Sequence, residues 1–162
     1  MNELLRILTQ IMLLSKVGIA VDLINWHILS SMNNYQNYAD LIKPTWAPPS
    51  WLFGPVWTVL YAIIIVSYIH VGKLFFTKAI PFAVVLPFIL NVIFNILFTP
   101  IQFGLKNNLL AAVDIVLVLG TLIWAMVMIW PYAKWVVYAN IPYLAWVSFA
   151  TVLQLTVTYL NR

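Results

Sequence analysis

The sequence predicts an all-α membrane protein, a five-transmembrane-helix bundle with a ligand cavity. The first observation is composition, because 64% of the 162 residues are hydrophobic and only 7% are charged. Soluble domains carry about 25% charged residues, so this surface is not built for water. The second observation is the presence of five apolar stretches, each near the roughly 20 residues that cross a bilayer as a helix. We therefore expect a single membrane domain over residues 1–162 with almost no soluble portion.

Short connections separate most of the predicted helices. Pro81 suits a first helical turn, Gly104 ends an apolar stretch, and Pro131 marks another turn. Residues 30–50 are polar and proline-rich, which predicts an ordered loop or lid at one membrane face. The helices are expected over about residues 4–29, 51–71, 80–103, 109–130 and 134–160.

The scattered positive charge and the scarcity of catalytic residue types exclude several classes of function. The net charge is +4, but the eight basic residues are scattered singly between apolar stretches, where they meet lipid headgroups. A nucleic-acid site would need a basic cluster, so the expected partner is the lipid bilayer and not nucleic acid. The chain has no cysteine, and His27 and His70 stand alone. We therefore expect no metal site, no obligatory cofactor and no conventional catalytic group.

The third predicted helix carries a stripe of amides. Asn91, Asn95, Phe98 and Gln102 follow one another at i, i+4, i+7 and i+11, so they share one helical face. Lipid would penalise this face, which therefore points into the bundle. Two interpretations remain open: hydrogen bonds between helices, each worth about 0.6 kcal/mol, or the wall of a cavity.

Aromatic side chains form a second stripe. Phe53, Trp57 and Tyr61 repeat every four residues on the second helix, and on the fifth Trp146 is flanked by Tyr143, Phe149 and Ala150. Such stripes are usually packing. Facing an amide stripe, they would instead form a flat, mostly apolar slot with a few polar groups, which is typical of ligand sites. An indole N–H in that slot needs an acceptor from a neighbour or a ligand.

Several prolines and an isolated carboxylate lie within the predicted helices. Pro55, Pro87 or Pro100, and Pro142 are each predicted to interrupt a helix, either as tolerated bends or as kinks that open space. Asp114 lies near the predicted start of the fourth helix, where a carboxylate suits the helix dipole or a Ser/Trp partner.

Motifs along the chain resemble one membrane family. The segment Trp46-Ala-Pro-Pro-Ser-Trp-Leu-Phe-Gly-Pro-Val-Trp57 resembles the signature of the TspO/MBR family, which comprises the tryptophan-rich sensory proteins and the translocator protein. NVIFNILFTPIQFG, from Asn91 to Gly104, resembles the third helix of the family. PYLAWVSFAT, from Pro142 to Thr151, resembles its fifth helix. The resemblance extends from about Tyr38 to Leu160.

The resemblance implies a five-helix bundle whose cavity opens near the first loop. Family members bind porphyrins such as protoporphyrin IX and haem, and isoquinoline or benzodiazepine-type drugs; mitochondrial members also bind cholesterol, and many are homodimers. Trp57 and Asn95 match positions that contact the polar group of the ligand. Gln154-Leu155 replaces an Asn-Tyr pair of the proposed cholesterol motif, which favours porphyrin over sterol. The stripes and the resemblance together assign these ligand-binding residues: Tyr38, Trp46, Phe53, Trp57, Tyr61, Asn91, Asn95, Phe98, Trp146 and Ala150.

The expected function is porphyrin binding inside a bacterial or organelle membrane, as a sensor, regulator or translocator. Its partner would be a porphyrin or another apolar planar small molecule. One alternative is enzymatic, the light- and oxygen-dependent breakdown of bound porphyrin with Trp57 and Trp146 as electron donors. The other alternative is binding and transport of sterols or lipids.

Overall fold

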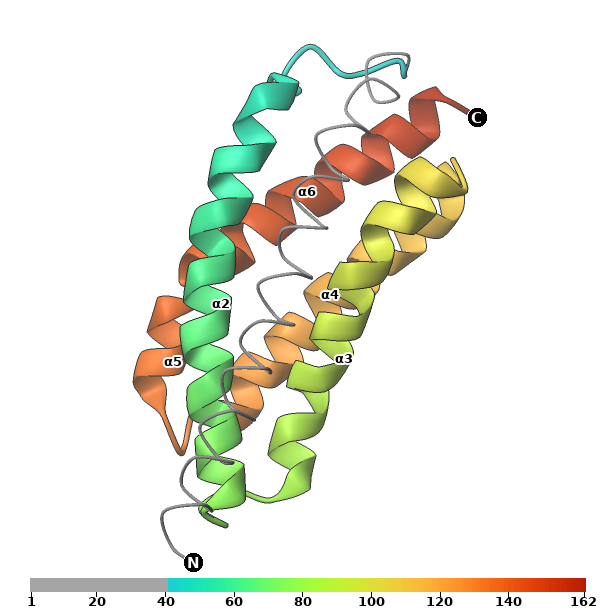
Figure 1. The fold of residues 1–162 in the computed structure, drawn as a ribbon. Helices are drawn as coiled ribbons and strands as arrows, with labels where there is room; N and C mark the ends of the chain where they lie inside the picture. Colours follow the sequence, from blue (N-terminus) through green and yellow to red (C-terminus); the bar gives the residue numbers. More distant parts are fainter. Residues whose placement is uncertain (1–40) are drawn as a thin grey trace, which may run out of the picture.

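The structure, a computed structural model, describes residues 41–162, and over that range all its regular secondary structure is helical, with no strand (Figure 1). The predicted first helix with Lys16 and Asp22, and the loop as far as residue 40 with Tyr38, lie outside the described residues. Four long helices form the bundle: α2 (Phe53–Phe76), α3 (Phe82–Thr99), α4 (Asn108–Ile129) and α6 (Ile141–Leu160). Three short elements adjoin them: η1 (Ser50–Leu52), the π-helical η2 (Pro100–Gly104) and α5 (Lys134–Ala139).

Each long helix can cross a bilayer by length and composition. A helix of 20 residues rises about 30 Å, the thickness of a hydrocarbon core. The protein is therefore an integral, multi-pass membrane protein, as the sequence predicts. The four candidate spans among the described residues are Ser50–Phe76, Phe82–Gly104, Asn108–Ile129 and Ile141–Leu160.

The prediction of one continuous helix over residues 134–160 is wrong, because the structure divides it at Asn140. Pro142 has no N–H to donate, and its ring would clash with the carbonyl four residues earlier in a continuous helix. Asn140 instead takes φ −91° and ψ 3°, and its carbonyl accepts from Leu144 N at 2.9 Å in the first turn of α6. The fifth predicted span therefore begins at Ile141, and α5 is a separate short helix beside α2 (Figure 1).

The other prolines agree with expectation only in part. Pro55 lies in the first turn of α2, where its missing N–H costs nothing, so it does not interrupt that helix. Pro87 does lie inside α3. Pro100 changes the helix type: the backbone N–H of Leu105 bonds to the Pro100 carbonyl at 2.9 Å, five residues back. Such single π turns occur often at functional sites.

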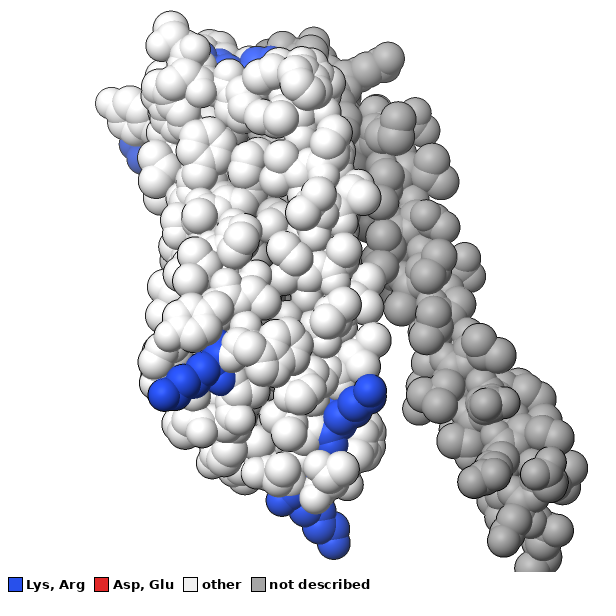
Figure 2. Space-filling view, turned by 90° about the vertical axis from the view of Figure 1, so that its left-hand side faces the viewer, with Lys and Arg blue, Asp and Glu red and all other residues white. Residues whose placement is uncertain are grey.

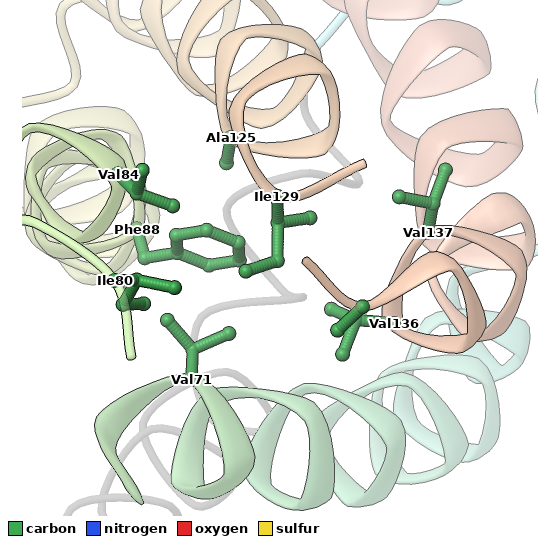
Figure 3. Close-up of a cluster of buried hydrophobic side chains, with 9 residues drawn as sticks. Val71, Ile80, Val84, Phe88, Ala125, Ile129, Val136 and Val137 are labelled. Atoms are coloured by element: carbon green, nitrogen blue, oxygen red, sulfur yellow. The ribbon is translucent and has the colours of Figure 1, made fainter. Parts of the chain in front are cut away.

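Two apolar clusters hold the bundle together. The cluster in Figure 3 joins the end of α2, the start of α3, the end of α4 and α5 at the end of the bundle remote from residues 41–50. The second cluster joins α2, α4 and α6 nearer the loop, and includes Leu60, Leu122 and the fully buried Tyr143. Between the second cluster and η2 lies the cavity described below.

The charges lie where lipid headgroups would be. Figure 2 shows Lys and Arg towards the two ends of one face, with an uncharged band between them. Lys43, Lys106 and Arg162 belong to the end with the loop, and the other described basic residues, Lys73, Lys78 and Lys134, to the opposite end. Three against three gives no positive-inside bias over the described residues.

Candidate functional site

Aromatic rings from α2 and α6 meet near the loop end of the bundle. The rings of Phe53 and Trp146 are 5.7 Å apart, edge to face at 72°. Trp57 stacks on Tyr61 at 5.3 Å and meets Tyr143 edge-on at 6.3 Å. Offset-stacked and edge-to-face pairs are the favoured aromatic geometries. The two aromatic stripes of the sequence therefore lie against each other.

The amide stripe is divided between two roles. Asn91 is 1% exposed, and its oxygen accepts from the hydroxyls of Tyr68 at 2.8 Å and Tyr143 at 3.2 Å. Its nitrogen donates to the Val118 carbonyl at 2.9 Å and to the Thr121 hydroxyl at 3.2 Å. Every polar atom of this side chain is thus bonded inside the bundle, so for Asn91 the interhelical interpretation holds.

Asn95 belongs both to that network and to a cavity. Its nitrogen donates to the Tyr143 hydroxyl at 2.9 Å, and its oxygen accepts from the Tyr61 hydroxyl at 3.2 Å. The residue also faces a cavity of about 80 Å³ that the described helices line. The walls of this cavity are Phe53 and Trp57 of α2; Asn95, Phe98 and Thr99 of α3; Gln102 and Phe103 of η2; Ile115 and Val118 of α4; and Trp146, Ala150, Leu153 and Gln154 of α6.

Most of the predicted site residues come together there. Six of them line the cavity: Phe53, Trp57, Asn95, Phe98, Trp146 and Ala150. Tyr61 and Asn91 do not line the cavity. Tyr61 stacks on the lining ring of Trp57, and Asn91 accepts a hydrogen bond from the hydroxyl of Tyr143. Trp46 lies in the loop, partly exposed, with its ring 5.9 Å from that of Phe149.

Seven further residues line the cavity, although they were not predicted as site residues: Thr99, Gln102, Phe103, Ile115, Val118, Leu153 and Gln154. Gln102 was part of the predicted amide stripe, and Gln154 lies four residues after Ala150 on the same face of α6. Their shared faces with predicted site residues could therefore have assigned both glutamines to the site from the sequence. Ile115 and Val118 look like ordinary apolar positions of a helix, and only the packing of α4 shows that they face a cavity.

The indole of Trp146 gives the wall a buried polar group without a partner among the described residues. The indole N–H of Trp146 is buried and finds no hydrogen-bond acceptor among the described residues. Burying such a group without a partner costs about 1–3 kcal/mol. Among the described residues, those that line the cavity include no ionisable side chain. The cavity thus suits a neutral, mostly apolar group that offers an acceptor to Trp146.

Asp114 lies near the start of α4, as the sequence predicted, but not where the helix dipole would stabilise it. The α4 helix begins at Asn108, capped by Asn107, whose side-chain oxygen accepts from Leu110 N at 2.9 Å. Asp114 is therefore the seventh residue of α4, beyond the first turn in which a helix dipole acts. It is buried, and its Oδ2 has no hydrogen-bond partner among the described residues.

Comparison with known proteins decides the family. The model of the TspO/MBR family matches residues 11–160. The chain belongs to the TspO/MBR family. Relatives include a tryptophan-rich protein TspO of Archaeoglobus fulgidus, 35% identical over 64% of this chain and 72% of the relative. A tryptophan-rich sensory protein of Cereibacter sphaeroides is 31% identical over 64% of this chain and 70% of its own. The human translocator protein is 37% identical over 64% of this chain and 68% of its own.

The two motifs that resemble the TspO/MBR family lead into helices that line the cavity. The W-A-P-P segment leads into η1 and α2, which bring Phe53 and Trp57 to the cavity. The P-Y-L-A-W segment opens α6 and brings Trp146 there. The two motifs thus supply the facing aromatic walls of one cavity in this TspO/MBR protein.

Proposed function

We propose that this TspO/MBR protein binds porphyrins, and similar planar apolar ligands of the isoquinoline or benzodiazepine type, in the cavity between α2, α3 and α6. Through that binding it acts as a sensor, regulator or translocator of its ligand. The observation that carries the proposal is the unpartnered indole N–H of Trp146 in a wall of aromatic and amide side chains. The names of two relatives, a sensory protein and a translocator protein, agree with ligand recognition in the membrane.

The size of the cavity limits how the ligand can sit. A volume of about 80 Å³ is well below the roughly 300–1,000 Å³ of ordinary ligand sites. It accommodates one edge or one substituted ring of a tetrapyrrole. In our proposal the remainder of the ligand extends past the described walls. Its anionic substituents lie outside this cavity, because the lining residues have no cation to hold them.

Fluorescence titration of the purified protein with protoporphyrin IX tests the proposal. Trp146→Phe keeps an aromatic ring and removes the N–H, so the dissociation constant should rise about fivefold, the equivalent of one hydrogen bond of about 1 kcal/mol. Trp124→Phe is the matched control, because Trp124 is 42% exposed on α4 and outside the cavity wall. Equal affinities of the two variants would remove Trp146 from the site, and absence of saturable quenching in the unmodified protein would refute porphyrin binding.

A second function, porphyrin photodegradation, is favoured by one specific feature. Trp57 and Trp146 both line the cavity, so two indoles would flank a bound, photo-excited porphyrin and could each donate an electron, with dioxygen as the oxidant. Illumination of the complex in air should then bleach the porphyrin absorption in the unmodified protein and more slowly in Trp57→Phe. A spectrum that stays constant under light in air contradicts this activity and leaves the binding proposal intact.

A further inference from the structure

Two buried glutamines meet at one side of the cavity. Gln102 of η2 and Gln154 of α6 are 4% and 6% exposed, and both line the cavity. The side-chain nitrogen of Gln154 donates to the side-chain oxygen of Gln102 at 2.9 Å. The π turn that follows Thr99 positions Gln102 for this contact. The pair is therefore a built feature of the interior and not a chance surface contact.

The orientation of the two amides is fixed by their neighbours. The Gln154 nitrogen also approaches the backbone carbonyl of Asn108 at 3.4 Å and the Thr158 hydroxyl at 3.3 Å. A backbone carbonyl can only accept, so the nitrogen of Gln154 must point towards it. The nitrogen of Gln102 in turn donates to the side-chain oxygen of Asn108 at 3.1 Å.

This arrangement leaves hydrogen-bonding capacity unused. Among the described residues, the oxygen of Gln154 accepts no hydrogen bond, and only one of the two N–H groups of Gln102 has an acceptor. The start of α4 does not need the pair, because Thr158 bonds to the Asn108 carbonyl at 2.9 Å and Asn107 caps the helix. Spare donors and acceptors on residues that line a cavity are available to a group bound there.

We propose that Gln102 and Gln154 form a second polar subsite of the cavity, which binds a neutral group that both donates and accepts hydrogen bonds, such as a carboxamide or lactam. The inference rests on the proposed function, since it assigns one end of the ligand that Trp146 also contacts. Trp146 and Gln154 are eight residues apart on α6, which separates the two subsites by about 12 Å along the helix. The ligand is therefore an elongated or broad planar molecule with polar groups at both ends.

The same atoms select against an anion. A carboxylate offers no donor to the oxygen of Gln154, and its negative charge would be repelled by the partial negative charge of that oxygen. The lining residues supply no cation to offset the desolvation of that carboxylate. A carboxamide of the same shape satisfies both glutamines, so the subsite distinguishes two ligands that differ only in this group.

The experiment compares protoporphyrin IX with its diamide, in which both carboxylates are converted to carboxamides. Tryptophan quenching should give the diamide a dissociation constant at least about tenfold lower in the unmodified protein. The double variant Gln102→Met, Gln154→Met keeps side-chain length and should lose most of that preference, whereas Thr156→Val should retain it. Thr156 bonds only to the Val152 carbonyl of its own helix at 2.8 Å among the described residues, and it lies outside the cavity wall.

The outcomes separate this subsite from the function on which it rests. Equal affinities for diacid and diamide in the unmodified protein overturn the subsite and leave porphyrin binding standing. A preference that persists in the double variant also overturns it, because the preference then reflects the solvation of the ligand alone. If neither compound quenches saturably, porphyrin binding itself fails. If the double variant does not fold, Gln154→Met alone provides the same comparison.

Discussion

Replacing Asn91 by Leu should destabilise the bundle without removing ligand binding. Leu keeps the branched shape of Asn but cannot hydrogen-bond, so the substitution removes the bonds to Tyr68, to Tyr143 and to the α4 atoms of Val118 and Thr121. Three interhelical connections at about 0.6 kcal/mol each give an expected loss of about 2 kcal/mol. Binding should change little, because Asn91 does not line the cavity.

Two matched variants make this result interpretable. Asn95→Leu removes bonds to Tyr61 and Tyr143 from the same network, but it also alters the cavity wall, so it should weaken both stability and ligand binding. Thr156→Val should change neither. Unfolding in mixed detergent micelles, followed by circular dichroism, gives the stability, and protoporphyrin quenching gives the affinity. A loss below about 0.5 kcal/mol for Asn91→Leu, or a tenfold loss of its affinity, would refute the division of roles between the two asparagines.

Three further outcomes are expected. Haem and iron-free protoporphyrin IX should bind within about threefold of each other, because the lining residues include no His, Cys, Met or Tyr to ligate iron; a low-spin haem spectrum on binding would contradict this. Pro100→Ala restores a backbone N–H and should regularise the π turn, so the contact between Gln102 and Gln154 and the preference for the diamide should both weaken; an unchanged preference would show that the π turn does not position Gln102. Asn140→Ala should cost no more than about 1 kcal/mol in micelle unfolding. It breaks the bonds to the Ser67 hydroxyl at 3.0 Å and to the Val136 carbonyl at 2.8 Å, but it also removes a buried side-chain oxygen with no partner among the described residues.

The sequence predicted the parts of this fold that depend on hydropathy and helical period. Apolar stretches located the second to fourth spans to within a few residues, and the four-residue repeats placed Trp57, Asn95 and Trp146 on inward faces. The break at Asn140 was not predicted, because Pro142 was interpreted as a kink within one helix. Instead, α5 ends after six residues, and Pro142 lies in the first turn of a new helix, α6.

The aromatic part of the candidate site was predictable from the sequence, but the amide part was predictable only incompletely. Asn91 and Asn95 have the same residue type on the same face, and the sequence could not show that tyrosine hydroxyls satisfy the first and leave the second beside a cavity. Gln154 lies on the same face of α6 as Ala150, but the sequence could not show that it meets Gln102, which lies 52 residues away in a π turn. The sequence placed Asp114 near the start of α4, but it could not show that the carboxylate is buried there and that its Oδ2 has no hydrogen-bond partner among the described residues.

The most direct test is the indole N–H resonance of Trp146 in ¹⁵N-labelled protein, assigned by its absence in Trp146→Phe. If the cavity binds porphyrin through this group, saturating protoporphyrin IX should shift the Trp146 resonance downfield, as a new hydrogen bond requires. The lipid-facing Trp124 should not move. A Trp146 resonance that stays in place while the porphyrin binds would contradict the assignment of this cavity as the ligand site.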